Sequence, residues 1–160
     1  MRRLRAAEVV TGLAAVVLLA SLPMTWFDVE AGSLMANALD TTGWAGLGWA
    51  MVAALVLSAL LALALRVAIV VGRSDSPGLV AGIALVVISV PTLLALVIVL
   101  LARPGLGVGL PRSAVGLAPA AWAGVISMAA LAAGSIASLH NERTTGADRR
   151  YTPPAPRPAP

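Results

Sequence analysis

The chain has 160 residues, of which 59% are hydrophobic and only 11% charged, and its mean hydropathy is +0.94. These values lie outside the range of ordinary water-soluble domains, and the apolar segments leave no room for a separate soluble domain. All 11 basic residues are arginine, and the absence of cysteine excludes disulfides, thiolate metal sites and a cysteine nucleophile.

The first apolar segment follows an arginine-rich start, and residues 9–27 carry no charge. We predict an uncleaved first membrane helix over about 8–27. The alternative is a cleaved signal peptide. Against it, the uncharged run is longer than a usual signal core, and Ala20-Ser21-Leu22 is a poor cleavage context because leucine stands where a small residue is needed.

The second and third apolar segments follow an acidic loop. The second is predicted to span about 44–66, with Arg66 extending its side chain toward the membrane surface. The third, 77–102, holds 26 residues without a charge and would be about 39 Å long as a helix, against roughly 30 Å of bilayer hydrocarbon. Pro91 lies in its middle and predicts a kink. A static kink that improves packing is preferred to a hinge or gate.

The fourth apolar segment follows a loop rich in glycine and proline and is predicted to span about 119–140. Residues 1–145 then form a four-helix transmembrane domain. Residues 146–160 form a cytoplasmic tail rich in proline and arginine, which is predicted to be disordered because it has too few large apolar residues to build a core. A solvated anchor is preferred to a tail that binds lipid or a partner and is released by phosphorylation.

Arginine and tryptophan positions predict the orientation. With the N-terminus inside, nine arginines lie on the inner side and only Arg103 and Arg112 on the outer side. Both termini are therefore expected in the cytoplasm. Trp49, about 7.5 Å deeper than Trp44 on one continuous helix, is expected to pack between helices. The predicted interface anchors are Trp26, Phe27, Trp44, Trp122, Arg2, Arg3, Arg5, Arg73 and Arg143.

Small residues recur every four positions along the second segment, and similar lines in the third and fourth also predict close helix packing. Packing within the chain's own bundle is preferred to association with a second copy or a partner. The predicted packing residues are Gly46, Ala50, Ala54, Ser58, Ala62, Gly78, Gly82, Ser127, Ala130 and Gly134.

No ionisable group is expected deep in the predicted spans. Glu8 is expected to pair locally with Arg5, and His140 lies at the inner end of the fourth span. No nucleophile–base pair, carboxylate pair or metal set can be assembled within the spans, so we expect no catalytic residue, cofactor or metal.

The layout resembles a group of uncharacterised actinobacterial four-pass membrane proteins over about residues 1–145. The matching elements are short: Leu22-Pro23-Met24-Thr25-Trp26, Thr42-Gly43-Trp44, Arg103-Pro104-Gly105, Ala121-Trp122-Ala123-Gly124 and Asn141-Glu142-Arg143. The group has no assigned activity, so the resemblance implies a topology and no mechanism.

The sequence therefore predicts an all-α integral protein of the cell membrane, with four transmembrane helices in an antiparallel bundle. We expect a non-catalytic accessory or interaction protein. The alternative is a subunit of an oligomeric channel or small-solute transporter. The expected partners are anionic lipid near the inner arginines and a membrane protein or second copy, and not nucleic acid.

Overall fold

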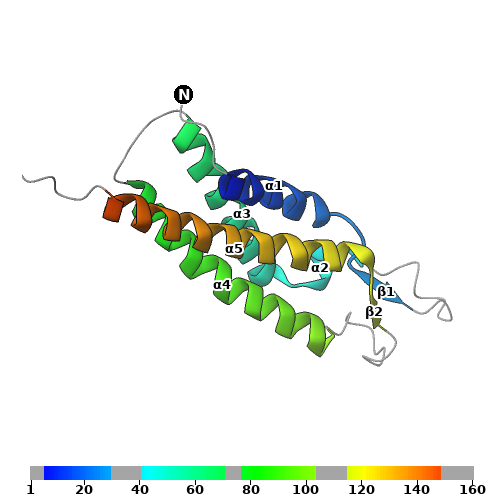
Figure 1. Ribbon diagram of the computed structural model, residues 1–160. Coiled ribbons are helices and arrows are strands. Elements are labelled where there is room, and N and C mark those ends of the chain that lie inside the picture. Colours follow the sequence, from blue (N-terminus) through cyan, green and yellow to red (C-terminus); the bar gives the residue numbers. More distant parts are fainter. Residues whose placement is uncertain (1–5, 30–40, 71–76, 104–114, 149–160) are drawn as a thin grey trace, which may run out of the picture.

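The computed structural model describes residues 6–29, 41–70, 77–103 and 115–148 (Figure 1). In this part of the chain the long helices are α1 (Ala6–Ser21), α3 (Trp49–Val70), α4 (Pro77–Ala102) and α5 (Pro119–Asp148). A short helix, α2 (Gly43–Gly46), precedes α3. Two short strands, β1 (Phe27–Val29) and β2 (Val115–Leu117), pair in an antiparallel two-stranded sheet.

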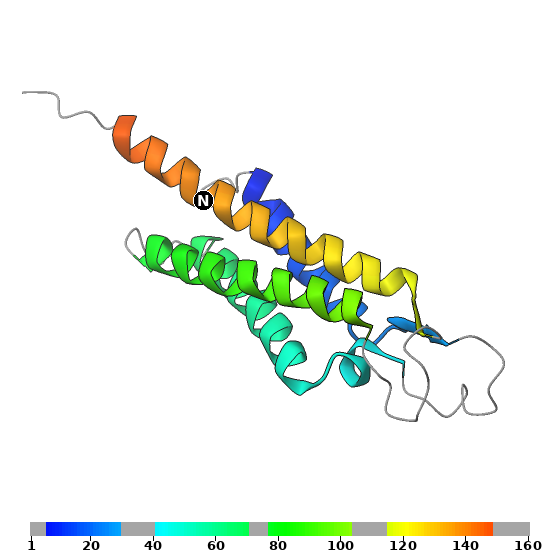
Figure 2. The ribbon, with the colours of Figure 1, turned by 90° about the horizontal axis from the view of Figure 1, so that it is seen from below.

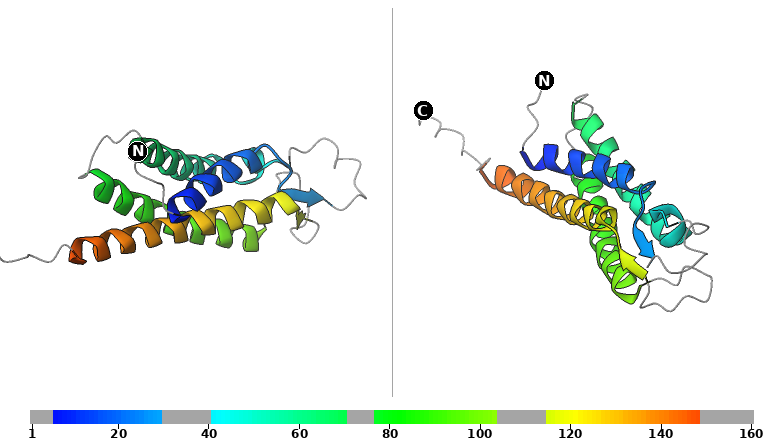
Figure 3. Two further views of the ribbon diagram at one scale, coloured as in Figure 1. Left: turned by 45° about the horizontal axis from the view of Figure 1, so that its top comes forward. Right: turned by 90° about the vertical axis from the view of Figure 1, so that its right-hand side faces the viewer.

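The long helices pack as neighbours in a ring. α1 packs most extensively on α5, and the other neighbouring pairs are α5 with α4, α4 with α3, and α3 with α1. α1 and α4 end, and α3 and α5 begin, at the end of the molecule that holds both strands and α2, called here the strand end (Figures 1 and 2). Further views show the same arrangement (Figure 3).

α3 and α4 each bury a seam of residues spaced alternately by three and four. This is the pattern by which helices pack side by side at a small crossing angle, with side chains of one helix between those of the next. On α4 the seam includes Gly82, Leu85, Ser89, Thr92 and Leu96. On α3 it includes Val52, Leu55, Ala59, Ala62 and Arg66. Leu100 on α4 and Ser58 and Leu65 on α3 are buried as well.

The polarity of the helix surfaces is the reverse of that in a water-soluble bundle. The buried polar residues are Thr11, Ser21, Ser58, Arg66, Ser89, Thr92, Ser127 and Ser135. Large aliphatic side chains instead cover the outside, among them Leu13, Leu60, Val67, Val87, Leu94, Ile98, Leu101 and Ile126. An apolar outer surface of this kind is favourable in contact with lipid chains, but its exposure to water costs free energy.

Within the described residues, three helices are long and apolar enough to cross a membrane, over Trp49–Ala68, Gly82–Ala102 and Pro119–His140. The predicted fourth crossing, at the start of the chain, is not among them. α1 has 16 residues, which gives about 24 Å of helix. It ends at Ser21 because Pro23 disfavours the helical conformation of Leu22.

α4 matches the predicted 77–102, and α5 begins at the predicted residue 119 but ends later. α3 differs from the predicted 44–66 at both ends, because it begins at Trp49 and ends at Val70. The predicted second span is divided between α2 and α3 because Gly48 adopts a φ of 76°, a conformation that interrupts a right-handed helix. α5 continues to Asp148 and takes in the first residues of the predicted disordered tail. The rest of that tail, 149–160, lies outside the described residues.

Pro91 lies inside α4, and the helix continues through it. Its ring is on the exposed outer face, so it does not fill a gap between helices. Thr92 donates from Oγ1 to the carbonyl of Ile88 at 2.7 Å. This hydroxyl therefore does not donate to the carbonyl of Val87, whose usual N–H donor is missing at Pro91.

Substitution of Gly48 tests the division between α2 and α3. A Cβ at this position would meet nothing within 4 Å, so Gly48→Ala is disfavoured only by the positive φ. We expect it to lower the free energy of unfolding by about 1 kcal/mol. Gly48→Asn is expected to cost less because asparagine tolerates this conformation. Thermal unfolding in detergent measures both variants. A melting temperature of Gly48→Ala above that of the wild type would contradict the prediction.

Candidate functional site

Trp26 is the centre of the strand end. Its side chain is 0% exposed. Its indole Nε1–H donates to the carbonyl of Ser21 at 2.6 Å, its backbone N–H donates to Thr41 O at 2.9 Å, and its carbonyl accepts from the N–H of Ala118 at 2.9 Å. One residue thus joins the end of α1, the connection into α2 and the connection into α5.

Three glycines make room for the buried rings of Trp26 and Phe27. A Cβ on Gly124 would overlap the six-membered ring of Trp26, and one on Gly46 would overlap the ring of Phe27. A Cβ on Gly43 would lie 2.8 Å from Trp26 Nε1. We call residues 22–29, 41–48 and 115–124 the strand-end cap, because they form one packed unit across the end of the helices.

The two-stranded sheet pairs two of the segments that form this cap. Phe27 lies opposite Leu117, Asp28 opposite Gly116 and Val29 opposite Val115, and a single bridge joins Thr25 to Thr42. The two strands belong to the two long connections at this end, from α1 to α2 and from α4 to α5. The sheet therefore holds both connections together.

The predicted role of Trp26 and Phe27 as surface anchors does not fit their placement. An anchor must expose its ring at the membrane surface, but Phe27 is 1% exposed and Trp26 is fully buried. The cause is the early end of α1, which lets the chain fold back across the helix ends. Gly124, which makes room for the ring of Trp26, was considered only as part of the resemblance element Ala121-Trp122-Ala123-Gly124, and no packing role was predicted for it.

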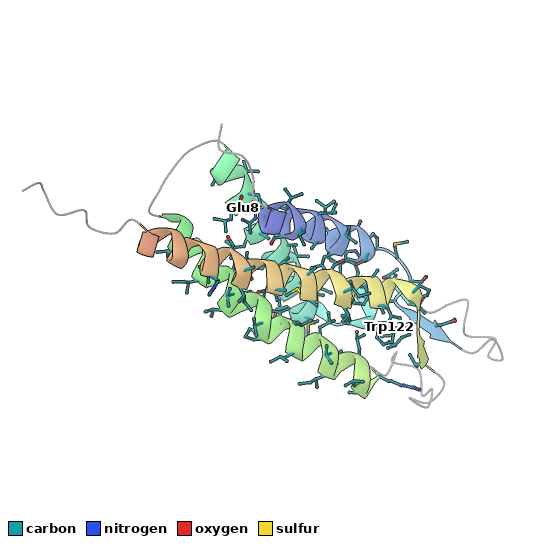
Figure 4. All side chains as sticks on the ribbon, in the orientation of Figure 1. Glu8 and Trp122 are labelled. Carbon is teal, nitrogen blue, oxygen red and sulfur yellow. The ribbon has the colours of Figure 1, made fainter. Side chains whose placement is uncertain are left out.

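The other three tryptophans are exposed and lie at the same end. Trp44 is 50% exposed, Trp49 is 85% exposed and Trp122 is 57% exposed. Trp122 is labelled near the strand end in Figure 4. The prediction that Trp49 packs between helices is wrong, because the interruption at Gly48 makes Trp49 the first residue of α3 and turns its side chain outward.

A charged pair lies near the opposite end, where Glu8 is labelled (Figure 4). Arg66 Nη1 on α3 is 4.0 Å from Glu8 Oε1 on α1, and both side chains are largely buried. Arg66 was expected to reach the surface and is instead 7% exposed. Glu8 was expected to pair within its own helix, and the structure brings it to a different helix. Arg5, the predicted local partner, lies outside the described residues.

The predicted small-residue faces are only partly buried. On α3, Ser58 and Ala62 are buried, Ala54 is half-buried and Ala50 is exposed, because the buried seam follows the alternating spacing and drifts away from a strict four-residue repeat. Gly46 belongs to α2 and packs on Phe27.

On the other two helices the predicted faces agree better with burial. Gly82 is buried, and a Cβ there would lie 2.9 Å from Leu139 Cδ2 on α5. Ser127 and Gly134 are buried, and Ala130 is half-buried. The side chain of Arg143 is not described, nor are the surroundings of Gly78. Four of the predicted anchors lie outside the described residues altogether: Arg2, Arg3, Arg5 and Arg73.

A matched pair of substitutions on α3 tests the buried seam. Ala62 is 0% exposed and belongs to the core, whereas Ala64, two residues on, is exposed. We expect Ala62→Leu to destabilise the fold by about 1–3 kcal/mol through overpacking and Ala64→Leu to have little effect. Unfolding in detergent measures both. Equal effects would show that the seam is placed on the wrong face of α3.

In the part of the chain that the structure describes, no group of three His, Asp or Glu side chains is gathered as a metal ion requires. Ser89 Oγ is buried without a hydrogen-bond partner among the described residues, whereas the hydroxyls of Ser58 and Ser135 donate to carbonyls of their own helices at 2.8 and 2.7 Å. Comparisons with protein-family models, with curated proteins and with solved structures found no match to this chain.

Proposed function

We propose that the chain is a multi-pass protein of the cell membrane, that all four long helices cross the bilayer as an antiparallel bundle, and that it works as a non-catalytic accessory or interaction protein. The observation that carries the proposal is the reversed polarity of the helices, with hydroxyl groups inside and large aliphatic side chains outside. A lipid surround stabilises this arrangement and water does not.

The proposal treats α1 as a crossing helix despite its length. Its outer side chains are as apolar as those of the longer helices, with Val9, Leu13 and Val16 each at least 51% exposed. It also lies between two helices that are long enough to cross, α3 and α5. A bilayer accommodates a short apolar helix by local thinning, at a modest cost in free energy.

For the orientation we propose that the strand end faces outward and that both termini are cytoplasmic. The support is the count of nine arginines against two, which follows the rule that cytoplasmic segments carry the excess of basic residues. The inner arginines would then attract anionic lipid. Reporter fusions at Ser33 and at the C-terminus test this orientation, and a C-terminus outside the cell would overturn it.

An interaction role would use the outer faces of the helices. The small residues Ala62, Gly82 and Gly134 are already buried within one chain, so a partner helix or a second copy would contact outward side chains such as Leu94 and Ile98. Crosslinking in the native membrane, followed by identification of the crosslinked species, tests the role. Solute flux through purified protein in liposomes would instead support the channel or transporter alternative.

A further inference from the structure

Three of the four tryptophans form a group set apart from the fourth by exposure. Trp44, Trp49 and Trp122 are at least half exposed, whereas Trp26 is fully buried. An indole combines a large apolar ring with one N–H donor, and this combination favours the boundary between lipid chains and headgroups. At 85% exposure, the indole of Trp49 packs little against the described part of the chain.

The same end marks the limit of the apolar helix surface. The apolar stretch of α3 begins at Trp49 and that of α5 begins at Pro119, three residues before Trp122. The uncharged α4 ends there too, with exposed Leu101 followed by the exposed charged residue Arg103. The exposed tryptophans thus lie at the end of the molecule where the apolar stretches of α3, α4 and α5 begin or end.

The interruption at Gly48 explains how Trp44 joins this group. On one continuous helix Trp44 and Trp49 would differ in depth by about 7.5 Å. Gly48, with its φ of 76°, ends that continuity. Trp44 then belongs to α2, inside the strand-end cap, and Trp49 begins α3.

We infer that the boundary between the lipid chains and the headgroups of the outer leaflet crosses the molecule at Trp44, Trp49 and Trp122, and that these three indoles are its contact with phospholipid at the strand end. The inference rests on the proposed membrane crossing and refines it. Trp26, Phe27 and the sheet then lie at or above the headgroups as a sealed unit, and do not belong to the lipid contact.

The test uses fluorescence quenching by depth. One variant, Trp44→Phe/Trp49→Phe/Trp122→Phe, retains only Trp26. Three further variants retain Trp26 and one exposed tryptophan each, so the buried centre is intact in all four. Each protein is placed in phosphatidylcholine vesicles whose acyl chains are brominated either near the glycerol or near the methyl end, and acrylamide reports access from water. Near-ultraviolet circular dichroism compares the packing of Trp26 across the variants.

We expect each exposed tryptophan to add emission that is quenched most by bromine near the glycerol, and we expect the Trp26-only protein to resist every quencher. Stronger quenching by bromine near the methyl end would place the boundary elsewhere and overturn the inference, as would quenching by acrylamide alone. Resistance of an exposed tryptophan to all quenchers would overturn it too, in favour of cover by a second copy. A protein that fails to float with vesicles would overturn the proposed membrane crossing itself.

Discussion

Gly124→Ala is expected to destabilise the protein by about 1–3 kcal/mol, a typical cost of overpacking a filled core. The added methyl group would overlap the six-membered ring of Trp26, which is fully buried. The ring has no free direction in which to move, because its Nε1–H is held on the Ser21 carbonyl at 2.6 Å and Gly43 lies against its other edge. Thermal unfolding in detergent measures the effect.

Gly116→Ala is the matched control for this substitution. Gly116 lies in β2 at the same end and is exposed, and a Cβ there would be 3.6 Å from its nearest neighbour, the carbonyl oxygen of Asp28. That separation is an ordinary contact, so we expect a small change in stability. A Gly116→Ala protein as unstable as Gly124→Ala would mean that the loss reflects the strand end in general and not the overlap with Trp26.

A second change distinguishes overlap from other causes. Trp26→Phe removes the part of the ring that Gly124 faces and also the donor to Ser21, so on its own it should destabilise the cap. Combined with Gly124→Ala it should cost less than the sum of the two, because the methyl group then has room. We expect a coupling within the range of 0.5–3 kcal/mol, about that seen for contacting residues. Additive losses would contradict the contact.

Helix existence and the bounds of α4 could be predicted from the sequence because they depend on composition. A run of 26 uncharged residues between Pro77 and Arg103 has no polar group that would end it earlier. The reversed polarity was also implicit in that composition, since apolar residues fill all sides of the helix. Of the seam on α4, only Gly82 was among the predicted packing residues, because a uniformly apolar helix carries no periodic signal of its inner face.

The strand-end cap could not be predicted because its contacts are tertiary. Trp26 follows an apolar run, as an interfacial tryptophan does, and only the fold shows that Gly43 and Gly124 form its walls. The strands have three residues each, too few to give an alternating pattern. Gly48 was the one local signal that was missed. A glycine such as Gly48, which lies between Trp44 and Trp49, allows a helix to break, but one continuous helix was predicted across it.

The charged pair between Glu8 and Arg66 was missed for a related reason. Each residue lies near a predicted helix end, where a local pair or an extended side chain satisfies the charge. Their meeting depends on α1 and α3 being neighbours, which helix order alone leaves open. Gly12 on α1 faces Arg66, but a Cβ there would lie 3.7 Å from Arg66 Cγ, an ordinary contact, so the approach does not depend on the glycine.

Removal of either charge in this pair is expected to destabilise the protein by about 3 kcal/mol, since a buried charge that loses its partner retains the cost of leaving water. The side chains of Arg66 and Glu8 are 8% and 14% exposed and lie 4.0 Å apart. Glu8→Gln and Arg66→Gln should therefore each lower the free energy of unfolding in detergent. Arg103→Gln, which changes an exposed arginine at the other end of the molecule, is the control and should have little effect.

Removal of both charges at once should cost much less than the two single changes added together. Replacing a buried ion pair by neutral groups of similar volume is often close to neutral, so Glu8→Gln/Arg66→Leu should be more stable than either protein that keeps one charge. Charge exchange, Glu8→Arg/Arg66→Glu, should recover part of the loss for the same reason. If the double neutral protein loses as much as the sum of the single changes, the two side chains do not interact across α1 and α3. Each charge would then contribute to stability through separate contacts of its own.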